Sequence, residues 1–327
     1  MIKTKRFNLL LGLGFILFAS LNAYAQDDDS EIIRVDTRLV SVDVLVTDKR
    51  TGARIDELKR EDFIILDDGR PQILTHFSKG SSGEQPLAIV LLVDTSTSMY
   101  QSKLTGIRAG IERAVKQLRA KDEMAVMTYS PGNKLVQELT GNRRLILDAL
   151  AAIAEKQEPS KKRIKHTGED MAAGFLAAQN HVRKRLPNAR IALVVISDDE
   201  NETPKETVTA TVEQLLRGGG VVSGLLKLRG KISLGNPLSR AKELNSFSEQ
   251  TGGEIVSVKD GDYSGALEQV IGDLAGSYSL GFVPDDKIQD GRFRKLTVKV
   301  SLPEKLGKGR KVEVKTRRGY FAPTQSQ

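Results

Sequence analysis

The sequence predicts an α/β fold, a doubly wound and mostly parallel sheet inserted between two β-segments. Within residues 86–276, apolar or β-branched runs alternate with stretches of helical spacing, as in sheets covered by helices on both faces. Residues 26–80 and 277–323 show only strand patterns and turns. Because isolated hairpins are marginally stable in water, we expect residues 31–78 and 277–323 to pack together as a small β-sandwich-like domain. Two independent β appendages are the alternative.

The chain begins with a leader-like segment. Lys3, Lys5 and Arg6 precede a short apolar run, and Ala23-Tyr24-Ala25 fits a small-residue cleavage site. The run is short for a membrane span. We therefore expect residues 1–25 to be a cleaved signal peptide, although an uncleaved anchor is the alternative. The mature chain has no other segment of transmembrane length and is expected in the periplasm or outside the cell.

Composition excludes several classes of function. A hydrophobic content of 39% and a charged content of 28% are typical of a globular protein. The absence of Cys excludes disulfides, thiol catalysis and thiolate metal sites. Aromatic residues make up only 5%, which argues against a surface that stacks sugars or single-stranded nucleic acid. Without the three leader cations the net charge falls from +8 to about +5, so no nucleic-acid partner is expected.

The elements follow from the spacing of apolar residues. In the first β-segment, Val40, Val42, Val44 and Val46 alternate with polar residues, as in a strand. Strands are predicted at 31–47, 62–66, 72–78, 87–93, 123–129, 134–138, 190–197, 220–226, 254–257, 277–283, 293–301 and 310–316. Helices are predicted at 102–119, 143–155, 169–185, 204–217, 237–250 and 263–275. The strands at 62–66 and 72–78 are expected to form a hairpin or a pair of short strands. The Lys and Arg residues of the last two strands are expected to face water.

Oxygen-bearing side chains follow two of the predicted parallel strands. Asp94-Thr95-Ser96-Thr97-Ser98 comes directly after strand 87–93, and Asp198 comes directly after strand 190–197. Thr167 lies in a loop that leads into the helix at 169–185 and could reach the same edge. Open parallel sheets bind ligands at the carboxyl ends of their strands. Carboxylate and hydroxyl oxygens suit Mg²⁺, Mn²⁺ or Ca²⁺, and an ion with few carboxylate ligands retains affinity for an external carboxylate.

With the Asp94–Ser98 loop, Thr167 and Asp198 in this order, residues 86–276 resemble the von Willebrand factor A family. The metal-dependent adhesion site of that family combines a D-x-S-x-S loop with a Thr and an Asp from two later loops. The resemblance implies direct ligation by Ser96, Ser98 and Thr167. It also implies that Asp94 and Asp198 act directly or through water. The flanking segments, among them RVDTRLVSVDVLVTD and RRGYFAP, resemble those of bacterial exported "VWFA-related" proteins. Glu169 is an alternative to Thr167, and it would make the site less attractive to an acidic partner. Asp199-Glu200 stand where the family often has Gly, and their charge would have the same effect.

Other interpretations of these residues explain less. A helix N-cap accounts for one Ser or Asp but not for the whole set. A haloacid-dehalogenase-type hydrolase needs a second Asp two residues after the first, where this chain has Ser96. A Ser–His–Asp hydrolase would have to use one of only three histidines (His76, His166 and His181), and no G-x-S-x-G motif occurs.

The sequence therefore predicts a non-enzymatic protein-binding module that captures an acidic side chain of a protein partner through a divalent cation. Mg²⁺ is the expected ion, with Mn²⁺ and Ca²⁺ as alternatives. The other hypothesis is a structural scaffold of an envelope complex, in which the metal serves stability alone.

Overall fold

The structure is a computed structural model that describes the larger part of the chain. The described residues are 39–80, 82–96, 99, 106–129, 132–156, 168–198, 203–227, 242–258, 262–284, 290–307 and 310–324. The predicted signal peptide and residues 31–38 of the first predicted strand lie outside this part. Among the described helices, none has both the length and the apolar character that crossing a membrane requires.

Residues 86–276 form the α/β part. Its elements alternate along the chain. They are β5 (Leu87–Asp94), α3 (Ile107–Ala114), η2 (Val115–Gln117), β6 (Glu123–Tyr129), β7 (Lys134–Thr140), α4 (Arg143–Lys156), α5 (Gly168–Arg185), β8 (Arg190–Ser197), α6 (Lys205–Gly218), β9 (Gly220–Lys227), α7 (Lys242–Thr251), β10 (Ile255–Val258) and α8 (Ser264–Gly276).

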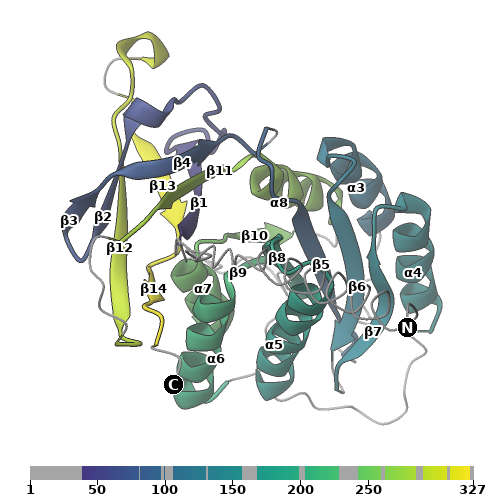
Figure 1. The fold of residues 1–327 in the computed structure, drawn as a ribbon. Coiled ribbons are helices and arrows are strands. Elements are labelled where there is room, and N and C mark those ends of the chain that lie inside the picture. The colour runs from purple at the N-terminus through teal and green to yellow at the C-terminus, as the bar shows by residue number, and fades with distance from the viewer. Residues whose placement is uncertain are drawn as a thin grey trace, which may run out of the picture. The chain divides into compact units, whose positions relative to one another are not determined.

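A six-stranded sheet in the order β10-β9-β8-β5-β6-β7 forms the middle layer of this part (Figure 1). All its pairs are parallel except the pair of β6 with the edge strand β7. The central strands β5 and β8 are buried at every residue, which explains their continuous apolar sequences. The predicted mostly parallel sheet is therefore confirmed.

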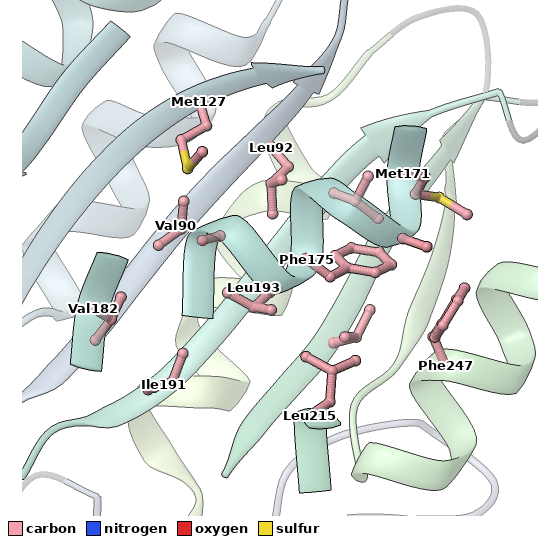
Figure 2. Close-up of a cluster of buried hydrophobic side chains, with 14 of the residues drawn as sticks. Val90, Leu92, Met127, Met171, Phe175, Val182, Ile191, Leu193, Leu215 and Phe247 are labelled. Carbon is pink, nitrogen blue, oxygen red and sulfur yellow. The ribbon is translucent and has the colours of Figure 1, made fainter. Parts of the chain in front are cut away.

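Helices cover both faces of the sheet through two separate hydrophobic clusters. On one face, α5, α6 and α7 pack on the strands, and Phe175 of α5 meets Phe247 of α7 at a ring-centroid distance of 5.2 Å (Figure 2). On the other face, α3, α4 and α8 bury residues such as Ile111 and Leu267 against the sheet. Helices packed on both faces hold the sheet in place, and they thereby fix the positions of the carboxyl ends of its strands.

The two β-segments combine into a small sandwich, as predicted. Its strands are β1 (Val40–Asp48), β2 (Phe63–Asp67), β3 (Arg70–Gln72), β4 (Leu74–Ser78), β11 (Tyr278–Phe282), β12 (Phe293–Val300), β13 (Val312–Thr316) and β14 (Gly319–Phe321), with short 3₁₀ turns η1 (Arg60–Asp62) and η4 (Glu304–Leu306). One sheet has the order β13-β1-β11-β4 and the other β14-β12-β2-β3. Both sheets therefore mix strands from the two ends of the chain, and they share one core.

Several details differ from the sequence prediction. The run predicted as one strand at 72–78 is divided at Ile73, so that β3 pairs with β2 while β4 joins the other sheet beside β11. The predicted hairpin is therefore formed by β2 and β3 alone. The helix predicted at 102–119 is described as α3 followed by the 3₁₀ turn η2. The strand β14 was not predicted.

The amino edge of the six-stranded sheet packs against the sandwich through three ion pairs. Each pair joins one residue of the sandwich to one residue of the α/β part, and each includes a well-buried side chain. They are Asp43–Arg190 at 2.8 Å, Lys315–Glu254 at 3.0 Å and Arg54–Asp273 at 3.5 Å. The prediction that the lysines of the last strands face water is thus wrong for Lys315. The reason is that this face of β13 is covered by the α/β part.

Candidate metal centre at the carboxyl edge of the sheet

Asp94 is the last residue of β5, in the middle of the sheet. Its side chain is buried, with 2% of the residue exposed. One carboxylate oxygen accepts the backbone N–H of Ser96 at 2.9 Å, and the other accepts the hydroxyl of Ser197 at 3.0 Å. The apolar run of β5 ends where the strand emerges from between the helices, and Asp94 is the next residue. It therefore lies at the carboxyl edge of the sheet, where open parallel sheets bind ligands.

In the loop after Asp94, Thr95 and Ser96 bond to different parts of the chain. Thr95 is fastened to β6, since its backbone N–H and its hydroxyl both donate to the carbonyl oxygen of Tyr129 at 3.1 Å. Ser96 is fully buried, and its Oγ accepts the backbone N–H of Met99 at 3.1 Å. This bond gives one oxygen of the motif a local structural role.

Ser197 is a residue of the site that the sequence interpretation missed. It is the last residue of β8, and its hydroxyl bonds to Asp94 because β8 lies beside β5 in the sheet. Asp198 follows at once and is half-buried. The only signal in the sequence was its position between an apolar strand and a candidate ligand.

The remaining candidates are not all within the described part of the chain. Ser98 and Thr167 lie outside it, as does the side chain of Glu169, the alternative ligand. The helix α5, which carries residue 169 in its first turn, approaches β5 closely at Gly174. A Cβ atom there would lie 3.1 Å from both Leu92 and Asn133. A larger side chain at this position would push the start of α5 away from the strand ends.

The donors that are described fit a hard divalent cation. Asp94, Ser96 and Asp198 offer carboxylate and hydroxyl oxygens, which Mg²⁺, Mn²⁺ and Ca²⁺ prefer. A carboxylate has about four lone-pair positions and a hydroxyl has two, so each of these groups can accept a hydrogen bond and coordinate an ion at the same time.

Two of the three histidines are described, and each contacts a residue outside the Asp94 loop. His76 on β4 lies 3.4 Å from the hydroxyl of Ser78, and His181 on α5 lies 3.3 Å from Glu138. His166 lies outside the described residues.

Residues 89–201 match the family model of the von Willebrand factor type A domain. Such domains generally mediate protein–protein interactions and are generally not enzymes. No curated protein matches the chain at a significant level.

Solved structures share low sequence identity with this chain. A von Willebrand factor type A protein from Catenulispora acidiphila is 11% identical at a TM-score of 0.47, with 81% of this chain and 74% of that one covered. The conserved hypothetical protein BatB from Bacteroides thetaiotaomicron is 18% identical at 0.41, with 58% and 98% covered. The manganese-loaded TRAP protein of Plasmodium vivax is 13% identical at 0.42, with 79% and 98% covered.

Proposed function

Because this chain carries a von Willebrand factor type A domain, we propose that it binds a protein partner through a divalent cation at Asp94, Ser96, Ser98, Thr167 and Asp198. The cation would supply an open coordination position that accepts a carboxylate of the partner. Mg²⁺ is the proposed ion, with Mn²⁺ or Ca²⁺ as substitutes.

The observation that carries this proposal is the arrangement around Asp94. Its buried carboxylate is held by Ser96 N–H, from the loop after β5, and by Ser197 Oγ, at the end of β8. These two bonds fix the orientation of the carboxylate. A cation bound at this edge would contact the oriented Asp94 carboxylate and the Ser96 hydroxyl. In this scheme Ser197 is a positioning residue that acts on Asp94.

We propose further that the protein acts outside the cytoplasm, after removal of residues 1–25. The basic n-region, the short apolar run and the small-residue cleavage site support this. N-terminal sequencing of the protein recovered from the extracytoplasmic fraction tests it, and a mature terminus at Gln26 is the expected result.

Metal binding is tested first, with the purified mature protein and calorimetric titration of Mg²⁺ and Mn²⁺. We expect saturable binding by the wild type and at least tenfold weaker binding by Asp94→Asn. Asp148→Asn is the matched control, because this carboxylate is exposed on α4 and should leave the affinity unchanged. Equal affinity in all three proteins would remove Asp94 from the metal site.

Partner capture is tested second, with immobilised peptides that contain a central Glu or its Gln counterpart. Binding that requires both Mg²⁺ and Glu, and that Asp94→Asn abolishes, is the expected result. The structural scaffold would be favoured instead if the metal stabilised the fold but EDTA left peptide binding unchanged. Turnover of a phosphate or acyl ester that depends on Asp94 would contradict both functions.

A further inference from the structure

The outer face of the sheet β14-β12-β2-β3 is unusually apolar for the exposed side of a sandwich. Alternation along β2 buries Phe63 and Ile65 in the sandwich core and turns Ile64 and Leu66 outward. The same alternation along β12 buries Leu296 and Val298. Exposed faces of antiparallel sheets normally carry polar side chains. We call this surface the outer sheet face; its members are Ile64, Leu66, Pro71, Ile73, Phe293, Lys295, Thr297 and Lys299. Phe321 of β14 lies beside Phe293 but packs against the α/β part, where the guanidinium of Arg217 lies 4.1 Å from its ring centroid.

Strand pairing makes these side chains neighbours. Ile64 pairs with Lys299, and Leu66 pairs with both Thr297 and Pro71. Ile73 follows directly after Gln72, the partner of Ile65, and so lies next to Ile64.

Exposure is concentrated on this surface. Ile73 is 82% exposed, Ile64 46% and Phe293 44%. Within the described part of the chain, only Leu39 and Leu145 are other large hydrophobic residues of comparable exposure. Contiguous exposed apolar surface usually marks a site of interaction.

The charge of the outer sheet face is positive. Lys295 and Lys299 are exposed on it. The four strands contain a single acidic residue, Asp67, which points inward and accepts the hydroxyl of Tyr320 at 2.8 Å. Just beyond β2, Asp68 accepts the backbone N–H of Lys295 at 2.8 Å. The acidic groups near this surface are therefore engaged within the sandwich.

We propose that the outer sheet face docks on an anionic phospholipid surface, with Ile64 and Ile73 entering the headgroup boundary and Lys295 and Lys299 beside lipid phosphates. Aliphatic side chains flanked by lysines are typical of proteins that lie on membranes. Protein-binding hot spots instead favour Trp, Tyr and Arg, and lysine is depleted from protein interfaces. A second copy of this chain would bring four lysines together on one contact, which their repulsion opposes.

Flotation with lipid vesicles tests the proposal on the mature protein. We expect binding to vesicles that contain phosphatidylglycerol and little binding to pure phosphatidylcholine. Replacing both lysines, Lys295→Gln with Lys299→Gln, should weaken binding about 30-fold, at about 1 kcal/mol for each lysine. Ile64→Ser with Ile73→Ser should weaken it by tenfold or more. Both pairs are exposed, so the thermal midpoint should stay close to that of the wild type.

Leu145→Ser is the matched control, because Leu145 is 42% exposed on α4 and outside the outer sheet face. It should bind vesicles as the wild type does. Several results would overturn the proposal: no binding to anionic vesicles, equal binding to neutral vesicles, or unchanged binding by both double variants. A dimer that the isoleucine variants dissociate would assign the face to a second copy. Binding to an acidic peptide but not to vesicles would assign it to a protein.

Discussion

At the amino edge of the six-stranded sheet, charged side chains meet partners of opposite sign from the sandwich. At the carboxyl edge, Asp94 instead accepts hydrogen bonds from an amide and a hydroxyl. The strand β8 connects the two situations, because it begins at Arg190, paired with Asp43 at 2.8 Å, and ends at Ser197, bonded to Asp94 at 3.0 Å.

The difference separates a structural use of charge from a binding use. Removing one partner of a well-buried ion pair leaves the other charge poorly compensated, which destabilises the fold. The Asp94 carboxylate is oriented by an amide and a hydroxyl at the edge where we propose a cation. Stability should therefore depend mainly on the amino edge, and ligand binding mainly on the carboxyl edge.

The largest expected effect is that of Arg190→Ala. This change removes the ion pair with Asp43, whose side chain is 23% exposed and also lies near the charge of Arg317, and the hydrogen bond from Arg190 to the carbonyl oxygen of Leu274. We expect a loss of about 2–3 kcal/mol in the free energy of unfolding, measured by urea denaturation. Arg144→Ala is the control, since its pair with Asp148 is exposed and should be worth less than about 0.5 kcal/mol. Similar losses for both variants would contradict a structural role for the amino edge.

A second prediction concerns pH. Burial, followed by the nearby charge of Glu254 and a hydrogen bond to it, raises the pKa of Asp273 from 3.8 to about 7, although Arg54 and Lys315 act in the opposite direction. The folded protein therefore holds a proton that the unfolded chain releases above pH 3.8. This stabilisation is complete below that pH and is lost as the pH rises through about 7. Between these limits the loss should approach about 1.4 kcal/mol per pH unit.

Urea denaturation at several pH values between 5 and 7 measures this slope. Asp273→Asn should flatten it, because the amide resembles the protonated acid at every pH. Asp148→Asn should keep the wild-type slope. A slope that survives in Asp273→Asn would assign the pH dependence to other groups.

At the carboxyl edge, Ser197→Ala should have a smaller effect. It removes one hydrogen bond to the buried Asp94 carboxylate, worth about 1.5 kcal/mol in the free energy of unfolding. Ser82→Ala, which removes an exposed hydroxyl–carbonyl bond to Lys79, is the matched control and should cost less than about 0.5 kcal/mol. If the two variants were equally stable, the bond to Asp94 would not contribute to the stability of the fold.

The smallest effect on stability is expected for Asp94→Asn in the presence of EDTA. The amide oxygen can still accept the Ser96 N–H, and the Ser197 hydroxyl can accept where it formerly donated. A change below about 1 kcal/mol is expected from urea denaturation. A loss as large as that of Arg190→Ala would mean that charged groups contribute equally to stability at both edges.

Much of the fold could be predicted because local patterns determine it. The continuous apolar runs that became β5 and β8 predicted buried parallel strands, and Asp94 and Asp198 were placed at strand ends on that basis. The division at Ile73 was missed, because residues 72–78 alternate as one strand and nothing local indicates that Leu74 enters a different sheet.

Contacts between distant residues could not be predicted. Ser197 lies beside Asp94 only because two strands about a hundred residues apart are neighbours in the sheet. Lys315 belongs to an alternating strand that was expected to face water, and its pairing with Glu254 depends on the docking of the α/β part. The assignment of Asp94, Ser96, Ser98, Thr167 and Asp198 as metal ligands stays a prediction.

The mixed strand order of the sandwich has a consequence for the synthesis of the chain. In its sheet β1 lies between β11 and β13, and β2 lies between β12 and β3. More than two hundred residues separate β2 from β12. At about 5–20 residues per second, the ribosome needs roughly 10–50 seconds to bridge that interval. During this time Val42, Val44 and Ile65 are synthesised but lack the strands that later bury them. The sandwich therefore contains the first strands that are made, and it is the last domain to close.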